Sequence, residues 1–387
     1  MSKVFIDEST LTTIGNAIRA KAGTTELIAP QNMGEAITNL PSGGGGDLPE
    51  EAFLVTGNCN YKFTGGWDWF IRDYGNRITT KDIETSSRMF QACYDVESIP
   101  FELNFLSSSA SHDVNSMFYD CFALKSLPKL INVKPSQLSY MFAYCRSLKV
   151  IPDDYFDTWD FSYVESQTSG YGGNSAQLFN NCYSLRSFPY KILERVNKNS
   201  SYSYTWLSSG FASCKALDEL VDLPIPYTAT YTSNLLSNTF LYCNRLKNIT
   251  FAMPDGQPYV KSWKSQTMDL TKDVGYIGLY DKGDILNHNS GITADKEVTD
   301  DATYQALKND PDWFTTKIEY CRYNHDSAVA TINSLPDTSA YLASAGGTNT
   351  IKFMGAAGSA TDGGAINTLT EAEIAVATAK GWTVTLS

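Results

Sequence analysis

The sequence predicts an α/β solenoid, in which short repeated units stack side by side between capping units at both ends, with a helical hairpin preceding the stack. Three observations predict this class. Six segments share one spacing of Phe, Cys and Leu, most of these segments run into a Pro or a strand-like stretch, and 387 residues are too many for one ordinary core. A unit of this size cannot bury its own apolar face, so it has to stack on neighbouring units.

Each repeated unit has a Phe, a Cys three residues later, and then two apolar residues at further steps of three. In the second unit these are Phe118, Cys121, Leu124 and Leu127, followed by Pro128. Steps of three predict a short helical or 3₁₀ turn with one apolar face, and Pro favours an extended residue before it. One turn and one extended segment would make one coil. The units span residues 86–100, 115–128, 139–152, 176–189, 208–220 and 237–249.

The repeat cysteines are predicted to be buried free thiols in the core, because free Cys behaves as a small hydrophobic side chain. If the coils pack like helices, equivalent cysteines lie about 10 Å apart, beyond the roughly 7 Å that a disulfide allows between Cα atoms. No unit contains a CxxC or a nearby His pair, so neither a metal nor another cofactor is expected. These cysteines are Cys93, Cys121, Cys145, Cys182, Cys214 and Cys243.

Residues 1–42 are predicted to form two helices, the first capped at Ser9 or Thr10 and the second beginning at Pro30. A hairpin of this length is too small to fold alone, so its apolar stripes need a partner. We interpret it as an attachment or oligomerisation module; the alternative is a flexible terminus without a partner. The stripe residues of the module are Ile14, Ile18, Met33 and Ile37.

The remaining domain boundaries follow from composition and pattern. Residues 43–48 are a Gly-rich linker, and residues 49–83 are an N-terminal cap of hairpin strands with an aromatic cluster at its end. Residues 84–250 hold the six units, and residues 251–387 hold irregular repeats and a C-terminal cap. The last helix is predicted to start with a capping box between Thr370 and Glu373 and to stop at Gly381.

Composition limits the partners. The net charge is −12, which opposes binding to the phosphate backbone of nucleic acid or to an anionic membrane. No apolar run is long enough to span a bilayer, and the N-terminus has no signal-peptide pattern, so we expect synthesis in the cytoplasm and no membrane insertion. Charged residues make up only 19% of the chain and aromatic residues 13%, which indicates a neutral, hydroxyl-rich and aromatic surface.

The repeated MFxxCxxLxxIP pattern resembles the BspA-type leucine-rich repeats of bacterial surface proteins and of bacteriophage tail or baseplate-associated proteins. Residues 84–250 carry the resemblance, with departures at Gly210, Thr239 and Thr250. Residues 9–40 are similar to an N-terminal module of phage tail and fibre proteins, and the end of the chain from Tyr323 onward resembles the ends of such proteins. The resemblance implies a virion protein that docks to other virion proteins through its N-terminal module and forms a homo-oligomer, with a trimer favoured.

The function expected from these features is a structural component of a phage tail, fibre or baseplate, which presents its repeats to a host receptor or to other subunits. The alternatives are a bacterial cell-surface adhesin and a polysaccharide depolymerase. No catalytic motif accompanies the three histidines, which are expected to be solvated, so the protein is not expected to be an enzyme. Neighbouring acidic residues such as Asp153 and Asp154 rarely converge on one substrate.

Two long insertions between units are rich in Tyr, Trp, Ser and Gly, a composition typical of adaptable recognition surfaces. We predict that they contact a host glycan or a protein partner. The alternative is that their rings pack on the strands beneath them. The candidate binding residues are Tyr155, Trp159, Tyr163, Tyr202, Tyr204 and Trp206.

Overall fold

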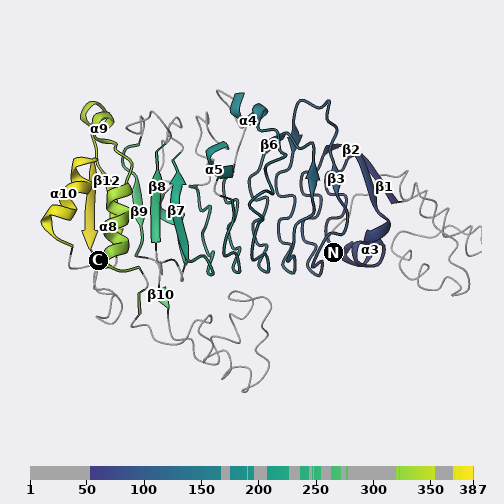
Figure 1. Ribbon diagram of the computed structural model, residues 1–387, viewed down its shortest axis with the longest axis horizontal. Coiled ribbons are helices and arrows are strands. Elements are labelled where there is room, and N and C mark those ends of the chain that lie inside the picture. Colours follow the sequence, from purple (N-terminus) through teal and green to yellow (C-terminus); the bar gives the residue numbers. More distant parts are fainter. Residues whose placement is uncertain are drawn as a thin grey trace, which may run out of the picture.

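The computed structural model shows an elongated stack of coils that lie side by side along its long axis (Figure 1). The structure describes residues 53–166, 175–189, 191–195, 207–225, 236–243, 246, 248–253, 263–271, 276–277, 320–321, 323–353 and 369–386. The predicted N-terminal module, residues 1–42, and the predicted linker, residues 43–48, lie outside the described residues.

Short strands join consecutive coils, and the paired strands of the stack run parallel. The parallel pairs are β1 (Leu54–Asn58) with β2 (Thr79–Thr85), β3 (Leu103–Asn104) with β5 (Leu130–Ile131), β4 (His112–Asp113) with β6 (Pro135–Gln137), and β7 (Glu219–Pro224) with β8 (Asn248–Ala252). A parallel sheet of β9 (Thr267–Asp269), β12 (Asn349–Phe353) and β13 (Trp382–Leu386) follows, and β10 (Tyr276–Ile277) pairs antiparallel with β11 (Tyr320–Cys321).

The predicted antiparallel hairpin in the N-terminal cap is wrong. β1 and β2 are parallel, and the chain between them crosses over through α3 (Asp68–Tyr74) and the short η3 (Gly75–Arg77). Alternation of apolar and polar residues indicates strands, but it does not distinguish parallel from antiparallel pairing. The crossover helix α3 carries the aromatic side chains of the predicted cap, and Phe70 packs on Phe53 and Phe63 of the first coil.

In the first five units the turn is a chain of β-turns, where a helical or 3₁₀ turn was predicted, while the sixth unit begins with the 3₁₀ helix η4 (Leu236–Asn238). In the second unit the Val114 carbonyl accepts from the Met117 N–H, and the Phe118 carbonyl accepts from the Cys121 N–H at 3.1 Å. The third residue of each turn, Ser116 or Asp120, has a positive φ of 53° or 63°, as a type II turn requires. A β-turn and a 3₁₀ turn both close over three residues, so the spacing of three fits either.

Backbone hydrogen bonds join each coil directly to the next. Ser116, Phe118 and Asp120 donate their N–H groups to the carbonyls of Ser139, Met141 and Ala143, each at 3.0 Å. The same alternation recurs from the coil at residues 59–66 to the coil at residues 236–243. Coils bonded in this way lie about 4.8 Å apart, as strands in a sheet do, so the predicted spacing of about 10 Å is wrong.

This bonding aligns equivalent side chains into columns. The repeat Phe rings form one buried column, with neighbouring ring centroids 5.4–6.1 Å apart and ring planes within 15° of parallel. The members of this phenylalanine column are Phe63, Phe90, Phe118, Phe142, Phe179, Phe211 and Phe240. Because Phe63 belongs to the column, the regular stacking already begins within residues 49–83, which were predicted to be a cap.

The repeat cysteines form a second buried column, and the prediction that all six are buried free thiols is confirmed. Each Sγ donates to the carbonyl of the Phe in the preceding coil, as Cys121 does to Phe90 at 3.0 Å and Cys145 to Phe118 at 3.1 Å. Burial raises the pKa of every one of these thiols, that of Cys243 to about 12. The repeat cysteines are buried and free as predicted, but the spacing of about 10 Å between coils that supported this prediction is wrong.

The C-terminal part adds helices to the last sheet. Asn324 caps α8 (His325–Ser334), α9 (Ser339–Ala345) follows, and α10 (Glu371–Ala379) begins with the predicted capping box, which is confirmed. Gly381 has a φ of 83°, and a Cβ there would lie 2.7 Å from Thr338 Oγ1, so the helix can stop only at a glycine. Two further short elements are α4 (Ser162–Ser166) and α5 (Lys191–Arg195).

Replacing Phe142 with Ala should lower the free energy of unfolding by about 3–5 kcal/mol, because the ring is fully buried between Phe118 and Phe179 and its loss leaves a cavity. Urea denaturation monitored by circular dichroism measures the change. Tyr94→Ala is the control, since 46% of Tyr94 is exposed, and it should cost about 1 kcal/mol or less. Equal losses in the two variants would contradict the stacked column.

Candidate recognition surface

The residue that directly follows each of the first five repeat cysteines belongs to a column along the edge of the stack, which we call the edge ladder. Tyr94 and Phe122 have ring centroids 5.0 Å apart. The Arg146 guanidinium lies 4.3 Å from the centroid of Phe122 and 5.1 Å from that of Tyr183, and the Lys215 ammonium lies 4.8 Å from Tyr183. Rings and cations therefore stack without interruption across five coils, from Tyr94 to Lys215.

Three tyrosines lie beside the edge ladder. Tyr119 contacts Tyr140 and Tyr144, with centroids 6.1 and 5.4 Å apart. Arg146 joins them to the ladder, because its guanidinium carbon lies 5.9 Å from the Tyr144 centroid. We call the whole set the aromatic edge, and its members are Tyr94, Tyr119, Phe122, Tyr140, Tyr144, Arg146, Tyr183 and Lys215.

Two tyrosines of the aromatic edge occupy strained backbone positions. Tyr140 and Tyr144 have φ angles of 59° and 64°, where a residue other than Gly loses roughly 1–2 kcal/mol. The equivalent of Tyr144 is Asp120 in one neighbouring coil and Asn181 in the other, and Asn and Asp tolerate this conformation best. The equivalent positions in other coils, such as Ala92 and Ser213, also have a positive φ, so the strained conformation belongs to the turn of the stack and does not itself mark a functional site.

Burial affects the titration of several groups in the aromatic edge. It raises the pKa of Tyr119 and of Tyr183 above the ordinary phenol value, at which the group is already neutral at pH 7, so both hydroxyls can donate a hydrogen bond. Burial also raises the pKa of Asp120, while the positive charge of Arg146 opposes that shift. Arg146 Nε is buried and has no hydrogen-bond partner within the described part of the chain.

Further cations flank the aromatic edge. The fourth residue after the repeat cysteine is Lys125, Lys149 and Arg186 in three consecutive coils, and backbone hydrogen bonds join Arg186 to Lys149. Lys125 is exposed and pairs with Glu97 at 2.9 Å between Nζ and Oε1. The same position is acidic in the two flanking coils, Glu97 and Asp218, so the basic residues are confined to the middle three coils.

The predicted binding residues of the first insertion pack on the stack. Trp159 is only 3% exposed and contacts Phe156 and Phe161, so for Trp159 the contact prediction is wrong and the packing alternative holds. Tyr155 is partly buried; its hydroxyl donates to the Pro128 carbonyl at 3.1 Å, and burial raises its pKa.

Tyr163 is also partly buried and packs against the core. The candidates of the second insertion, Tyr202, Tyr204 and Trp206, lie outside the described residues. The attachment residues Ile14, Ile18, Met33 and Ile37 do so as well.

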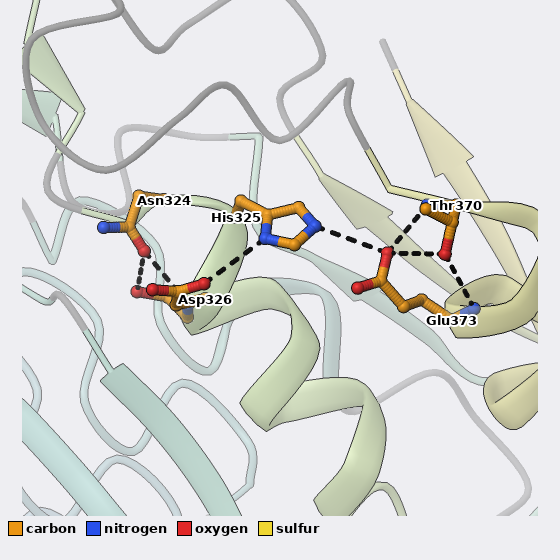
Figure 2. A network of polar contacts seen from close by, with 6 residues as sticks. Asn324, His325, Asp326, Thr370 and Glu373 are labelled. Atoms are coloured by element: carbon orange, nitrogen blue, oxygen red, sulfur yellow. Dashed lines mark hydrogen bonds and ion pairs between the residues drawn. The ribbon is translucent and has the colours of Figure 1, made fainter.

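The two described histidines have structural contacts. His112 is fully buried, which corrects the expectation of a solvated ring; its Nε2 lies 3.1 Å from the Leu106 carbonyl, and burial lowers its pKa. His325 is the first residue of α8, and its ring reaches toward α10, with Nδ1 3.3 Å from Asp326 and Nε2 3.3 Å from Glu373 of the capping box (Figure 2). This network ties two helix N-termini together, and no cluster of metal-ligating side chains occurs among the described residues.

The edge ladder was not predicted from the sequence, although the residues that form it follow a visible pattern. The residues that follow the six repeat cysteines are Tyr, Phe, Arg, Tyr, Lys and Asn, five of them aromatic or basic. These residues form a continuous ladder only because direct backbone hydrogen bonding places equivalent residues within stacking distance of one another. At the predicted spacing of about 10 Å the same side chains would not touch.

No protein-family model, curated protein or solved structure matches the chain. Among the helices that the structure describes, none has the length and apolar character needed to cross a membrane. The surface chemistry of the aromatic edge is therefore the main guide to function.

Replacing Trp159 with Ala should destabilise the protein by about 3 kcal/mol or more, because the indole is buried against Phe156 and Phe161. Binding per folded molecule should not change. Thermal melting together with adsorption to host cells separates the two effects, and Tyr163→Ala serves as a matched aromatic control nearby. Normal stability combined with lost adsorption would return Trp159 to the binding surface.

Proposed function

We propose that this protein is a structural component of a bacteriophage virion, in the tail, a fibre or the baseplate, and that it is not an enzyme. Its coil stack would be an irregular leucine-rich-repeat solenoid that presents a recognition surface to the host or to neighbouring subunits. The repeat pattern supports the class, because units with this spacing resemble the repeats of phage tail proteins.

The observation that carries the recognition role is the aromatic edge. Eight side chains from five consecutive coils form one continuous set of rings and cations. Aromatic side chains offer large contact area at low entropic cost, and phenols add hydrogen-bond donors. A rigid stack that fixes these groups in register is suited to binding.

Assembly is assigned to the N-terminal module. Residues 9–40 are similar to a module of phage tail and fibre proteins, and the glycines at 43–46 would separate the module from the stack. The proposed partners are other virion proteins and a second and third copy of this chain, as a homo-oligomer with a trimer favoured. The protein would be made in the host cytoplasm and become part of the virion.

A bacterial surface adhesin is the alternative that uses the same surface, since a partly exposed aromatic edge serves attachment in either setting. A polysaccharide depolymerase is the less favoured alternative. Glycoside hydrolysis ordinarily uses two facing carboxylates, and Asp120 is placed beside a guanidinium and phenols, an arrangement suited to binding.

Deleting residues 1–46 should leave the coil stack folded and abolish incorporation into the particle, because the module and its linker precede the first described coil. Tagged full-length and truncated chains can be expressed in infected cells, and particles purified by density gradient can be probed for the tag. Circular dichroism of the truncated chain is the control for folding.

Normal incorporation of the truncated chain would contradict the attachment role of the module. Absence of the full-length chain from purified particles would contradict the virion assignment itself.

A further inference from the structure

We propose that the aromatic edge binds an anionic saccharide chain, a surface glycan that carries carboxylate or phosphate groups, lying along the axis of the coil stack. This inference rests on the proposed function and names the class of ligand for its recognition surface.

The shape of the surface favours a polymer. The edge ladder crosses four steps between coils, which at about 4.8 Å each gives a continuous strip of roughly 19 Å. Each coil contributes one ring or one cation at the same position, so the strip repeats along the axis. A ligand built of repeating units can meet successive coils with equivalent groups.

Arg146 supplies the strongest argument for negative charge. Its guanidinium lies between the rings of Phe122 and Tyr183, which contact its two faces. Its N–H bonds lie in the plane of the guanidinium and point outward between the rings. Nε is shielded from solvent, so a ligand at the surface would meet the terminal N–H groups of the guanidinium and not Nε. A carboxylate or phosphate oxygen is the acceptor that the planar fork of Arg fits best.

The surroundings of Arg146 add complementary charge and hydroxyl donors. Lys149 lies in the same coil as Arg146, Arg186 in the next coil and Lys215 in the coil after that. The neutral phenols of Tyr119 and Tyr183 can donate to sugar oxygens. Two acids lie beside these cations: Asp120 interacts with Arg146, and Glu97 pairs with Lys125. The edge ladder itself carries two cations, Arg146 and Lys215, and no carboxylate, on a chain with a net charge of −12, which favours an anion at this face.

The test uses the full chain on a printed array that holds three groups of glycans: carboxylated, phosphate-bearing and neutral. We expect retention on acidic glycans and loss of retention when NaCl is raised from low to molar concentration, because salt screens charge contacts. The double variant Arg146→Gln, Lys215→Gln should lose tenfold or more in apparent affinity. Tyr94→Ala tests the rings by a separate substitution that leaves the charge intact and should also weaken retention.

The matched control is Lys81→Gln, Lys264→Gln, which removes the same charge at two exposed positions outside the aromatic edge and should retain wild-type binding. Melting temperatures establish that each variant is folded. If the Arg146 variant fails to fold, Lys215→Gln alone and Tyr94→Ala still carry the test.

The phosphate-bearing and carboxylated groups of the array distinguish the two sources of negative charge, and retention on either group supports the proposal. Retention on neutral glycans only, no retention on any acidic glycan, or equal losses in the edge and control variants would overturn it. Host adsorption that requires the aromatic edge, together with no acidic glycan bound, would overturn this inference while leaving the proposed function standing.

Discussion

The structure depends on one constraint, the direct backbone hydrogen bonding between consecutive coils. Alternate N–H groups in each turn donate to carbonyls of the next coil, so two positions per coil, such as Ser116 and Asp120, adopt a positive φ. This bonding fixes a spacing of about 4.8 Å, which is close enough for equivalent side chains to stack. All the columns of the stack follow from that distance.

Inside the stack the short spacing places Phe rings face to face and brings each Cys thiol within reach of the carbonyl before it. Outside, the same spacing turns isolated surface residues into the continuous edge ladder. One backbone arrangement therefore accounts for both the stability of the repeats and the chemistry of the candidate recognition surface. The price is conformational strain at residues such as Tyr140 and Tyr144, which the surrounding bonds hold in place.

Sequence patterns predicted the units, their buried Phe and Cys residues, and the capping box at Thr370, because each depends on local spacing that the chain displays directly. They did not predict the turn type, because steps of three fit both a β-turn and a 3₁₀ turn. The error in coil spacing followed from that choice and hid the edge ladder. Trp159 was assigned to binding from composition, but composition does not indicate which ring of an insertion faces the core.

The most direct test of the central claim is nuclear magnetic resonance detection of scalar couplings across hydrogen bonds, with a long-range HNCO experiment on deuterated protein. The backbone arrangement predicts couplings from the amide nitrogens of Ser116, Phe118 and Asp120 to the carbonyl carbons of Ser139, Met141 and Ala143. Couplings from these three amides only to carbonyls within their own unit, as helical turns would produce, would contradict it.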